Sequence, residues 1–345
     1  MPAIGTTTLS SIGRRWIMPK ITDNTYRKVP LLRRLQASNR MIVRGGTQLE
    51  IPLMYARMST GGPYSGYDVW NVTPSDTIRN AFFPWKQHYV TWSVDGLTLI
   101  QLDSPDSIAN FLVMQAEQAR MEMTENLATG VDGGGSTSAI AGYFGAGGAA
   151  TSYNDPKDIN GLTGLLGTST TLGDANYGGI ARSTNPWWNA QVDAATAVLT
   201  EAALQSMFTS FPGANTPTII RSRVDNYNRY FALNISGSHP VQYPRDPAGN
   251  DQLLASAGFT NLLFNQVPWL HDPHVTSGTT NNNNSAIQML NENFLYWVMP
   301  PRGDFVMRDF VEPPNQDAMV AGIKWAGQLV TTNSSVHGTL TAITA

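Results

Sequence analysis

The 345-residue sequence contains no cysteine. This absence excludes disulfide bonds, thiolate metal sites and a cysteine nucleophile. Long apolar runs are also missing, since no segment approaches the ~18 residues of a membrane-spanning helix and the N-terminus lacks the apolar stretch of a secretory signal. We therefore expect a cytoplasmic product that makes no contact with a membrane.

Charge is scarce as well. Charged residues make up 14% of the chain, against roughly 25% in an average soluble protein. Such a composition is typical either of a protein that shares much of its surface with partners or of a soluble β-rich protein coated with Thr, Asn and Ser. Residues 1–45 carry nine bases and one acid, so this segment has a net charge of +8 and the remainder −11. A basic arm of this kind suits contact with nucleic acid, a clasp on acidic neighbours or a loosely ordered tail.

The common signatures of cofactor and hydrolase chemistry are absent too. The sequence has no phosphate-binding Gly-x-x-x-x-Gly-Lys motif, no dinucleotide fingerprint and no Gly-x-Ser-x-Gly elbow. His271-Asp272-Pro273-His274 offers metal-ligand chemistry, but the internal proline favours a turn. Asp304, Asp309 and Glu312 resemble a glycosidase pair only in residue type. We expect a non-enzyme with no cofactor, no metal and no catalytic residue.

Residues 41–95 are predicted to form a long two-stranded ribbon. Apolar and polar residues alternate in 47–53 and again in 89–94, and we expect these two segments to pair. The turn-rich stretch between them carries Tyr64, Tyr67 and Trp70. Because a two-stranded ribbon is marginal alone in water, its apolar residues need another surface, and a neighbouring copy of the chain is the natural candidate.

A long amphipathic helix is predicted for residues 105–129. Asp103 and Pro105 supply start signals, apolar residues follow at helical spacing from Ile108 to Leu127, and Gly130 is expected to stop the helix. One apolar stripe on so long a helix predicts that a sheet lies on it. The Gly-rich stretch 132–150 is expected to be a loop or peripheral insertion.

Helix and strand signals then mix without regular alternation. Helices are predicted for 191–211 and 224–233, and strands for the intervening and following segments 218–222, 259–275, 294–310 and 319–343. This mixture favours an α+β fold over a doubly wound parallel sheet.

A series of short segments resembles the tailed-bacteriophage major capsid proteins of the Hong Kong 97 type. The series includes Val29-Pro-Leu-Leu-Arg-Arg-Leu, Arg44-Gly-Gly-Thr-Gln-Leu-Glu-Ile-Pro-Leu-Met-Tyr, Gly66-Tyr-Asp, Phe83-Pro-Trp-Lys, Tyr177-Gly-Gly-Ile-Ala-Arg with Trp187 and Trp188, and Pro314-Asn-Gln-Asp-Ala. Each segment is weakly specific alone, but together they span nearly the whole chain in order.

The resemblance implies a Hong Kong 97-like capsid fold with mixed sheets and a defined order of parts. These are an N-terminal arm (1–44), an extended β-hairpin E-loop (45–94), a P-domain (95–198) with its spine helix (105–129) and the Gly-rich insertion (132–150), an A-domain (199–285), and a return to the P-domain (286–345).

The resemblance also implies the role of a major capsid protein. Such a protein self-assembles into hexamers and pentamers of an icosahedral or prolate head that encloses double-stranded DNA, is assembled in the bacterial cytoplasm and resides in the virion. Because the arm begins at residue 1, a separate scaffolding protein is expected. The resemblance also implies a portal during assembly, with a decoration protein as an optional partner. An encapsulin-like compartment shares the fold and stays open as an alternative, as does a Trp-rich carbohydrate-binding or carbohydrate-active protein.

Two sets of contact residues are predicted. Interface residues between subunits come from the arm and the ribbon, namely Leu31, Leu32, Arg33, Arg34, Leu35, Tyr64, Tyr67, Trp70, Trp85 and Lys86. Arg14 and Arg15 are predicted to face DNA. Some members of the resembled family crosslink an E-loop lysine to a neighbour's asparagine, but Lys86 is the only lysine of the ribbon and lies away from its tip, so we expect non-covalent shells.

Overall fold

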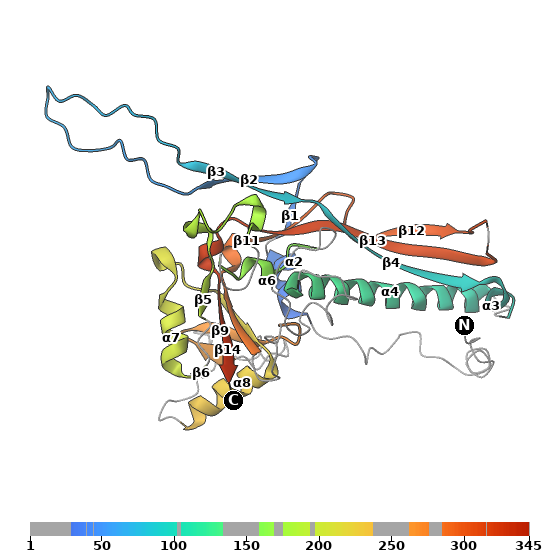
Figure 1. Cartoon of the computed structure of the whole chain (residues 1–345). Helices are drawn as coiled ribbons and strands as arrows, with labels where there is room; N and C mark the ends of the chain where they lie inside the picture. Colours follow the sequence, from blue (N-terminus) through green and yellow to red (C-terminus); the bar gives the residue numbers. More distant parts are fainter. Residues whose placement is uncertain are drawn as a thin grey trace, which may run out of the picture.

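The structure is a computed structural model and describes residues 29–38, 40–43, 45–101, 105–133, 159–168, 175–193, 197–236, 262–275, 285–314 and 316–344. It contains two mixed sheets, a long helix beneath one of them and a ribbon that projects from the body (Figure 1). This mixture of helix and sheet confirms the α+β prediction. Among the described residues, no helix has both the length and the apolar character needed to cross a membrane.

The first sheet is elongated and lies along the long helix. Its order is β1-β11-β13-β12, with β4 also paired to β13; the bounds are β1 (Arg40–Ile42), β4 (Lys86–Asp95), β11 (Leu295–Met299), β12 (Val306–Val311) and β13 (Ala318–Thr331). The helix α4 (Pro105–Gly133) contacts β4 and β13 (Figure 1). The predicted helix beneath a sheet is thereby confirmed.

The helix runs past its expected end. Gly130 lies inside α4, which ends at Gly133. A single glycine costs a helix only about 1 kcal/mol relative to alanine, so one Gly within a long helix is tolerated. Further along the buried stripe, Met123 and Leu127 are fully buried, whereas Leu112 is half-buried.

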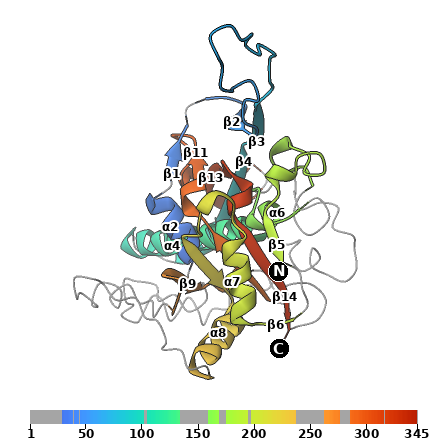
Figure 2. The ribbon, with the colours of Figure 1, turned by 90° about the vertical axis from the view of Figure 1, so that its left-hand side faces the viewer.

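The second sheet forms a separate body with its own apolar core. Its order is β5-β14-β10-β7-β9-β8, with β6 on β14; the bounds are β5 (Gln191–Asp193), β6 (Ala197–Val198), β7 (Ile219–Ser222), β8 (Leu262–Phe264), β9 (Val267–His271), β10 (Ser285–Leu290) and β14 (Gly338–Thr344). Helix α7 (Glu201–Thr209) contacts β14, and α8 (Val224–Ser236) contacts β7, β9 and β10. Figure 2 shows both helices on the side of this body that faces the viewer.

The prediction of one helix over 191–211 is wrong in its first half. Residues 191–193 and 197–198 form β5 and β6, which pair in parallel with β14, and α7 begins only at Glu201. Thr200 caps α7, since its side-chain oxygen accepts a hydrogen bond from Ala203 N–H at 3.2 Å. Pairing with a distant strand therefore overrides the local helical pattern.

The ribbon is built differently from the prediction. β2 (Gln48–Met54) pairs with β3 (Ile78–Pro84), whereas β4 leaves the ribbon and pairs with β13 along its whole length. The expected pairing of 47–53 with 89–94 is therefore wrong, although the predicted alternation within each segment holds. Residues 55–77 form the projecting end of the ribbon (Figure 1).

Two short α-helices and two 3-10 turns complete the parts used below. The helices are α2 (Pro30–Ser38), which contacts β11, and α3 (Gly96–Gln101), which contacts β4. The turns are η1 (Tyr177–Gly179) and η2 (Pro186–Trp188). We call residues 175–188, which hold both turns, the platform. Near it, α6 (Leu162–Leu165) contacts α4.

Candidate assembly surface

The projecting end of the ribbon exposes an unusual number of large apolar side chains. Within residues 55–77 the exposed ones are Met58, Tyr64, Tyr67, Val69, Trp70 and Val72. Tyr67 is fully exposed, and Tyr64 packs only edge-on against Trp70, with ring centroids 5.5 Å apart. Exposed large apolar side chains gathered on one short segment favour a binding surface. Three predicted interface residues, Tyr64, Tyr67 and Trp70, thus lie together on the exposed loop.

The base of the ribbon is already covered by its own chain. Leu49, Leu53 and Phe83 are buried in the main core, and the Phe83 ring meets Tyr177 of the platform at 5.5 Å, edge to face. A Cβ added at Gly178 would lie 3.0 Å from the Phe83 ring, and the φ of Gly178 is +63°. The expectation that a neighbouring copy covers these apolar strand residues is therefore corrected, because the main core of their own chain covers them and the platform packs against Phe83.

Trp85 and Lys86 lie where β3 passes into β4. The Trp85 indole N–H donates to the carbonyl of Gly46 at 3.0 Å, and Lys86 is 5% exposed. These two predicted interface residues therefore belong to the junction between ribbon and body rather than to the projecting loop.

The α2 helix separates its leucines from its arginines. Leu31, Leu32 and Leu35 are at most 1% exposed and join the main core of their own chain. Burial leaves these leucines no surface for a second subunit, and this corrects their predicted role. Arg33, on the opposite face, is exposed.

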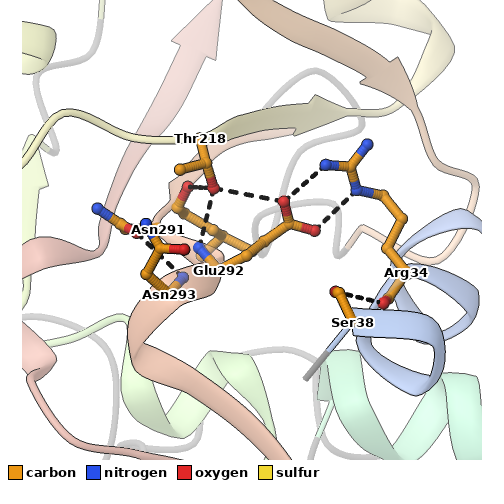
Figure 3. A network of polar contacts seen from close by, with 7 residues as sticks. Arg34, Ser38, Thr218, Asn291, Glu292 and Asn293 are labelled. Carbon is orange, nitrogen blue, oxygen red and sulfur yellow. Dashed lines mark hydrogen bonds and ion pairs between the residues drawn. The ribbon is translucent and has the colours of Figure 1, made fainter. Parts of the chain in front are cut away.

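Arg34 makes a two-pronged ion pair with Glu292. Its Nε and Nη2 donate to the two carboxylate oxygens at 2.7 Å each, and Thr218 joins the same carboxylate at 3.4 Å (Figure 3). Hydrogen bonding to Glu292 raises the pKa of the Arg34 guanidinium. Because Glu292 follows β10 and Thr218 precedes β7, this pair ties α2 to the junction between the two sheets. Arg14 and Arg15 lie outside the described residues.

A second polar network joins the second body to the long helix. Arg221 on β7 and Asp272 after β9 form a fully buried ion pair. The His274 ring contacts Asp272 Oδ1 through Nδ1 at 3.3 Å and Glu125 Oε1 of α4 through Nε2 at 3.0 Å. Both ring nitrogens face carboxylate oxygens, an arrangement that the doubly protonated, positively charged imidazole satisfies.

The pKa values of the network follow from these contacts. Burial lowers the pKa of His274, but hydrogen bonds to Asp272 and Glu125 outweigh it and raise the pKa overall. Burial pushes the pKa of Asp272 up, yet His274 and Arg221 hold it below its ordinary value. In the part of the chain that the structure describes, no group of three or more His, Cys, Asp or Glu side chains could hold a metal ion. The His271–His274 motif thus supplies a structural link that its sequence pattern did not reveal.

A cleft of about 500 Å³ opens beside the platform. Its lining includes Pro186, Trp187, Gln191, Pro212 and Ser335, and none of the described residues that line it is an acid. Of the three carboxylates considered for glycoside chemistry, Asp304 is engaged by Arg40 at 2.7 Å. The cleft therefore offers no carboxylate pair of the kind that glycoside hydrolysis requires.

Comparisons with known proteins reveal relationships only at the level of structure. No protein-family model and no curated protein matches the sequence. The structure resembles the "Cyanophage A-1(L) capsid asymmetric unit" with a TM-score of 0.63 and 15% identity, covering 99% of this chain and 100% of the other. It also resembles the capsid of a native GTA particle, with a TM-score of 0.56, 11% identity, and coverage of 99% and 100%.

A third similar structure is the holo-SrpI encapsulin complex of Synechococcus elongatus PCC 7942. Its TM-score is 0.52 at 10% identity, and the match covers 93% of each chain. These similarities extend over both sheets, the long helix and the ribbon, because nearly the whole chain is aligned. The chain therefore has the Hong Kong 97-like capsid fold.

Proposed function

We propose that the chain is the major capsid protein of a tailed bacteriophage, a structural subunit rather than an enzyme. In this proposal it assembles with itself into hexamers and pentamers of an icosahedral or prolate shell around double-stranded DNA. A scaffolding protein and a portal are its further partners during assembly, and a decoration protein is an optional one. The shell forms in the bacterial cytoplasm and becomes part of the virion.

The observation that carries the proposal is the exposed apolar loop at residues 55–77. Its aromatic side chains Tyr64, Tyr67 and Trp70 are exposed in the single chain, while the base of the same ribbon is packed into the main core. A ribbon whose strands are packed on the body while its loop exposes apolar side chains is suited to binding a second molecule through that loop. Repeated around a ring, such a head-to-tail contact closes into an oligomer, and many modest contacts then add by avidity.

The capsid fold supports the same conclusion. The cyanophage and GTA structures that this chain resembles are described as capsids. We propose by analogy that the subunit described here has the same kind of use. The domain boundaries expected from the sequence, from the arm at 1–44 to the return segment at 286–345, remain part of this proposal.

An encapsulin-like compartment is the second candidate, because the SrpI encapsulin matches over 93% of this chain. The contents of purified particles distinguish the two functions. Double-stranded DNA protected from nuclease supports the phage head, whereas one discrete packaged protein without DNA supports the compartment.

The direct test replaces the three exposed aromatic side chains of the loop. We expect the purified wild-type chain to form rings or shells in electron micrographs. A triple variant with Tyr64→Ser, Tyr67→Ser and Trp70→Ser should stay folded but remain unassembled, because these side chains are exposed and contribute little to the single-chain core. Ser59→Ala with Ser75→Ala, at exposed positions of the same loop, is the matched control and should assemble. A wild-type chain that stays monomeric at high concentration contradicts the proposal.

A further inference from the structure

Three side chains form a stack at the outer end of the paired strands of the ribbon, where the loop begins. The Tyr55 ring lies on the Trp187 ring, with centroids 5.5 Å apart and an interplanar angle of 22°. The Arg79 guanidinium carbon lies 5.4 Å from the centre of the Tyr55 ring. One member comes from each of three segments: Tyr55 follows β2, Arg79 belongs to β3 and Trp187 belongs to η2 of the platform.

The stack sits at the far end of the ladder between β2 and β3. Leu49 pairs with Phe83 near the body, whereas Leu53 pairs with Arg79 and Met54 with Ile78 at the outer end. Just beyond, the backbone N–H of Tyr55 donates to the carbonyl of Thr77 at 3.0 Å, and the Tyr55 hydroxyl donates to the carbonyl of Asp76 at 2.9 Å. Trp187 therefore contacts the ribbon just beyond its last paired residues, at the first residue of the loop.

A two-stranded ribbon bends and twists easily when nothing supports its outer end. Phe83 on Tyr177, together with buried Leu49 and Leu53, holds the paired strands of the ribbon against the body. The contact of Tyr55 with Trp187 lies farther out and adds the attachment nearest the loop. This outermost contact is the one placed to fix the direction in which the loop leaves the strands. In Figure 2 the loop beyond these points stands clear of the body.

Partial exposure distinguishes this stack from the core. Tyr55 and Trp187 are both half-buried, and Arg79 is exposed. Stacking and cation–π contacts of this kind are directional, so they hold an orientation while burying little area. Removing one ring should therefore loosen the direction of the ribbon more than it destabilises the fold.

We propose that Trp187, acting through Tyr55, sets the direction in which the loop at residues 55–77 projects. Trp187 is a positioning residue: it does not belong to the apolar end of the loop, but it determines where that end points. The consequence for assembly rests on the proposed function. A loop that always points in the same direction contacts the same surface of each neighbouring subunit. Neighbouring subunits then meet in the same way throughout the shell, so all shells reach the same size.

The absence of native cysteine allows a direct measurement of this direction. Ser65→Cys on the loop and Gln118→Cys on α4, both at exposed positions, accept one spin label each in an otherwise wild-type chain. Pulsed electron resonance on the unassembled subunit then reports the distance distribution between loop and helix. We expect one narrow distribution for the parent chain and a broadened or shifted one after Trp187→Ala or Tyr55→Ala.

Conservative variants separate positioning from folding. Trp187→Phe retains an aromatic face and should restore a narrow distribution. Tyr89→Ala removes an exposed aromatic residue on β4 and should leave the distribution unchanged. Melting curves show whether each variant folds. Tyr55→Ala removes the ribbon's side chain from the stack and leaves Trp187 in place, so it tests the same contact from the other side. An unchanged narrow distribution in both alanine variants overturns the proposal.

Assembly provides an independent second measurement. Trp187→Ala should still form particles, with a wider range of diameters in electron micrographs than Trp187→Phe. If the parent chain never assembles, the proposed function fails while the label distances still decide the role of Trp187. If all variants give particles of one size despite a broadened loop distribution, the link between ribbon direction and shell size is wrong.

Discussion

Arg221 Nη1 lies 3.0 Å from Asp272 Oδ2, and both side chains are only 1% exposed. A pair this deeply buried is costly to break from one side, because the remaining charge has lost its partner in a medium of low polarity. The pair also has a matched counterpart at the surface, Arg40 with Asp304, at 2.7 Å and one-third or more exposed.

Asp272→Asn should therefore lower the free energy of unfolding by about 3–5 kcal/mol. Asp304→Asn, the surface control, should change it by less than about 1 kcal/mol. Chemical denaturation of the unassembled subunit gives both values. Equal losses of unfolding free energy in Asp272→Asn and Asp304→Asn would show that burial does not determine how much each ion pair contributes to stability.

The His274 link predicts a dependence of stability on alkaline pH. Its folded-state pKa is raised, so its contribution is fully present below the unfolded value of about 6.5 and is lost as pH rises through the folded pKa. His274→Gln should thus cost more stability at pH 6 than at pH 9. Melting temperatures of wild type and variant across this range test the prediction. A difference that grows with pH would contradict a protonated imidazole between Asp272 and Glu125.

His337 predicts the opposite dependence. It is fully buried and its pKa is lowered to about 3 by desolvation. Its neutral ring accepts a hydrogen bond from the backbone N–H of Asn291 at 3.3 Å. Between pH 6.5 and 3 the unfolded chain binds a proton that the folded chain does not, so stability falls as pH falls, by up to about 1.4 kcal/mol per pH unit.

His337→Asn removes this titration. The slope of unfolding free energy against pH, measured between pH 4 and 6.5, should be shallower in the variant than in wild type. A parallel pair of curves would show that His337 takes up its proton in the folded state.

The long helix should respond unequally along its length. Met123 is fully buried in α4, whereas Leu112 is half-buried. Met123→Ala should cost about 2–5 kcal/mol of unfolding free energy, the usual range for a buried side chain, and Leu112→Ala clearly less. Leu112→Asp, within the apolar stripe predicted from Ile108 to Leu127, should be milder than Met123→Asp. The reverse order would mean that the exposed and buried sides of α4 are misassigned.

Lys86 is expected to form no covalent link between subunits. It is 5% exposed at the start of β4 and lies beside Gly327 in the sheet, so it belongs to the body of the subunit and not to the projecting loop. Assembled particles boiled in detergent should run as single chains in electrophoresis. A ladder of higher species that disappears in Lys86→Arg would show that a crosslink forms.

Local patterns predicted local structure well. The apolar spacing from Ile108 to Leu127 identified α4, and the alternation around Trp92 identified β4, because both signals lie within a few residues. The exposed aromatic residues Tyr64, Tyr67 and Trp70 were found in the same way, since turn residues separate them from both strands.

Pairings between distant segments were beyond the reach of such patterns. Strand β2 is apolar on one side whether its partner is β3 or β4, so its alternation cannot choose between them. The sequence pattern of the α2 leucines fits packing on a neighbouring subunit as well as burial in the core of their own chain. His274 and Glu125 are separated by 149 residues, and no local periodicity connects them.

Strand β13 has a mechanical consequence for any closed particle. Over its 14 residues it pairs with β4, β12 and β11, and through the short turn at Ser334–Val336 the chain continues into β14 of the other sheet. Tension applied across the subunit along this strand would load many antiparallel hydrogen bonds in shear at once rather than one by one. A wall made of such subunits would therefore resist stretching along this strand.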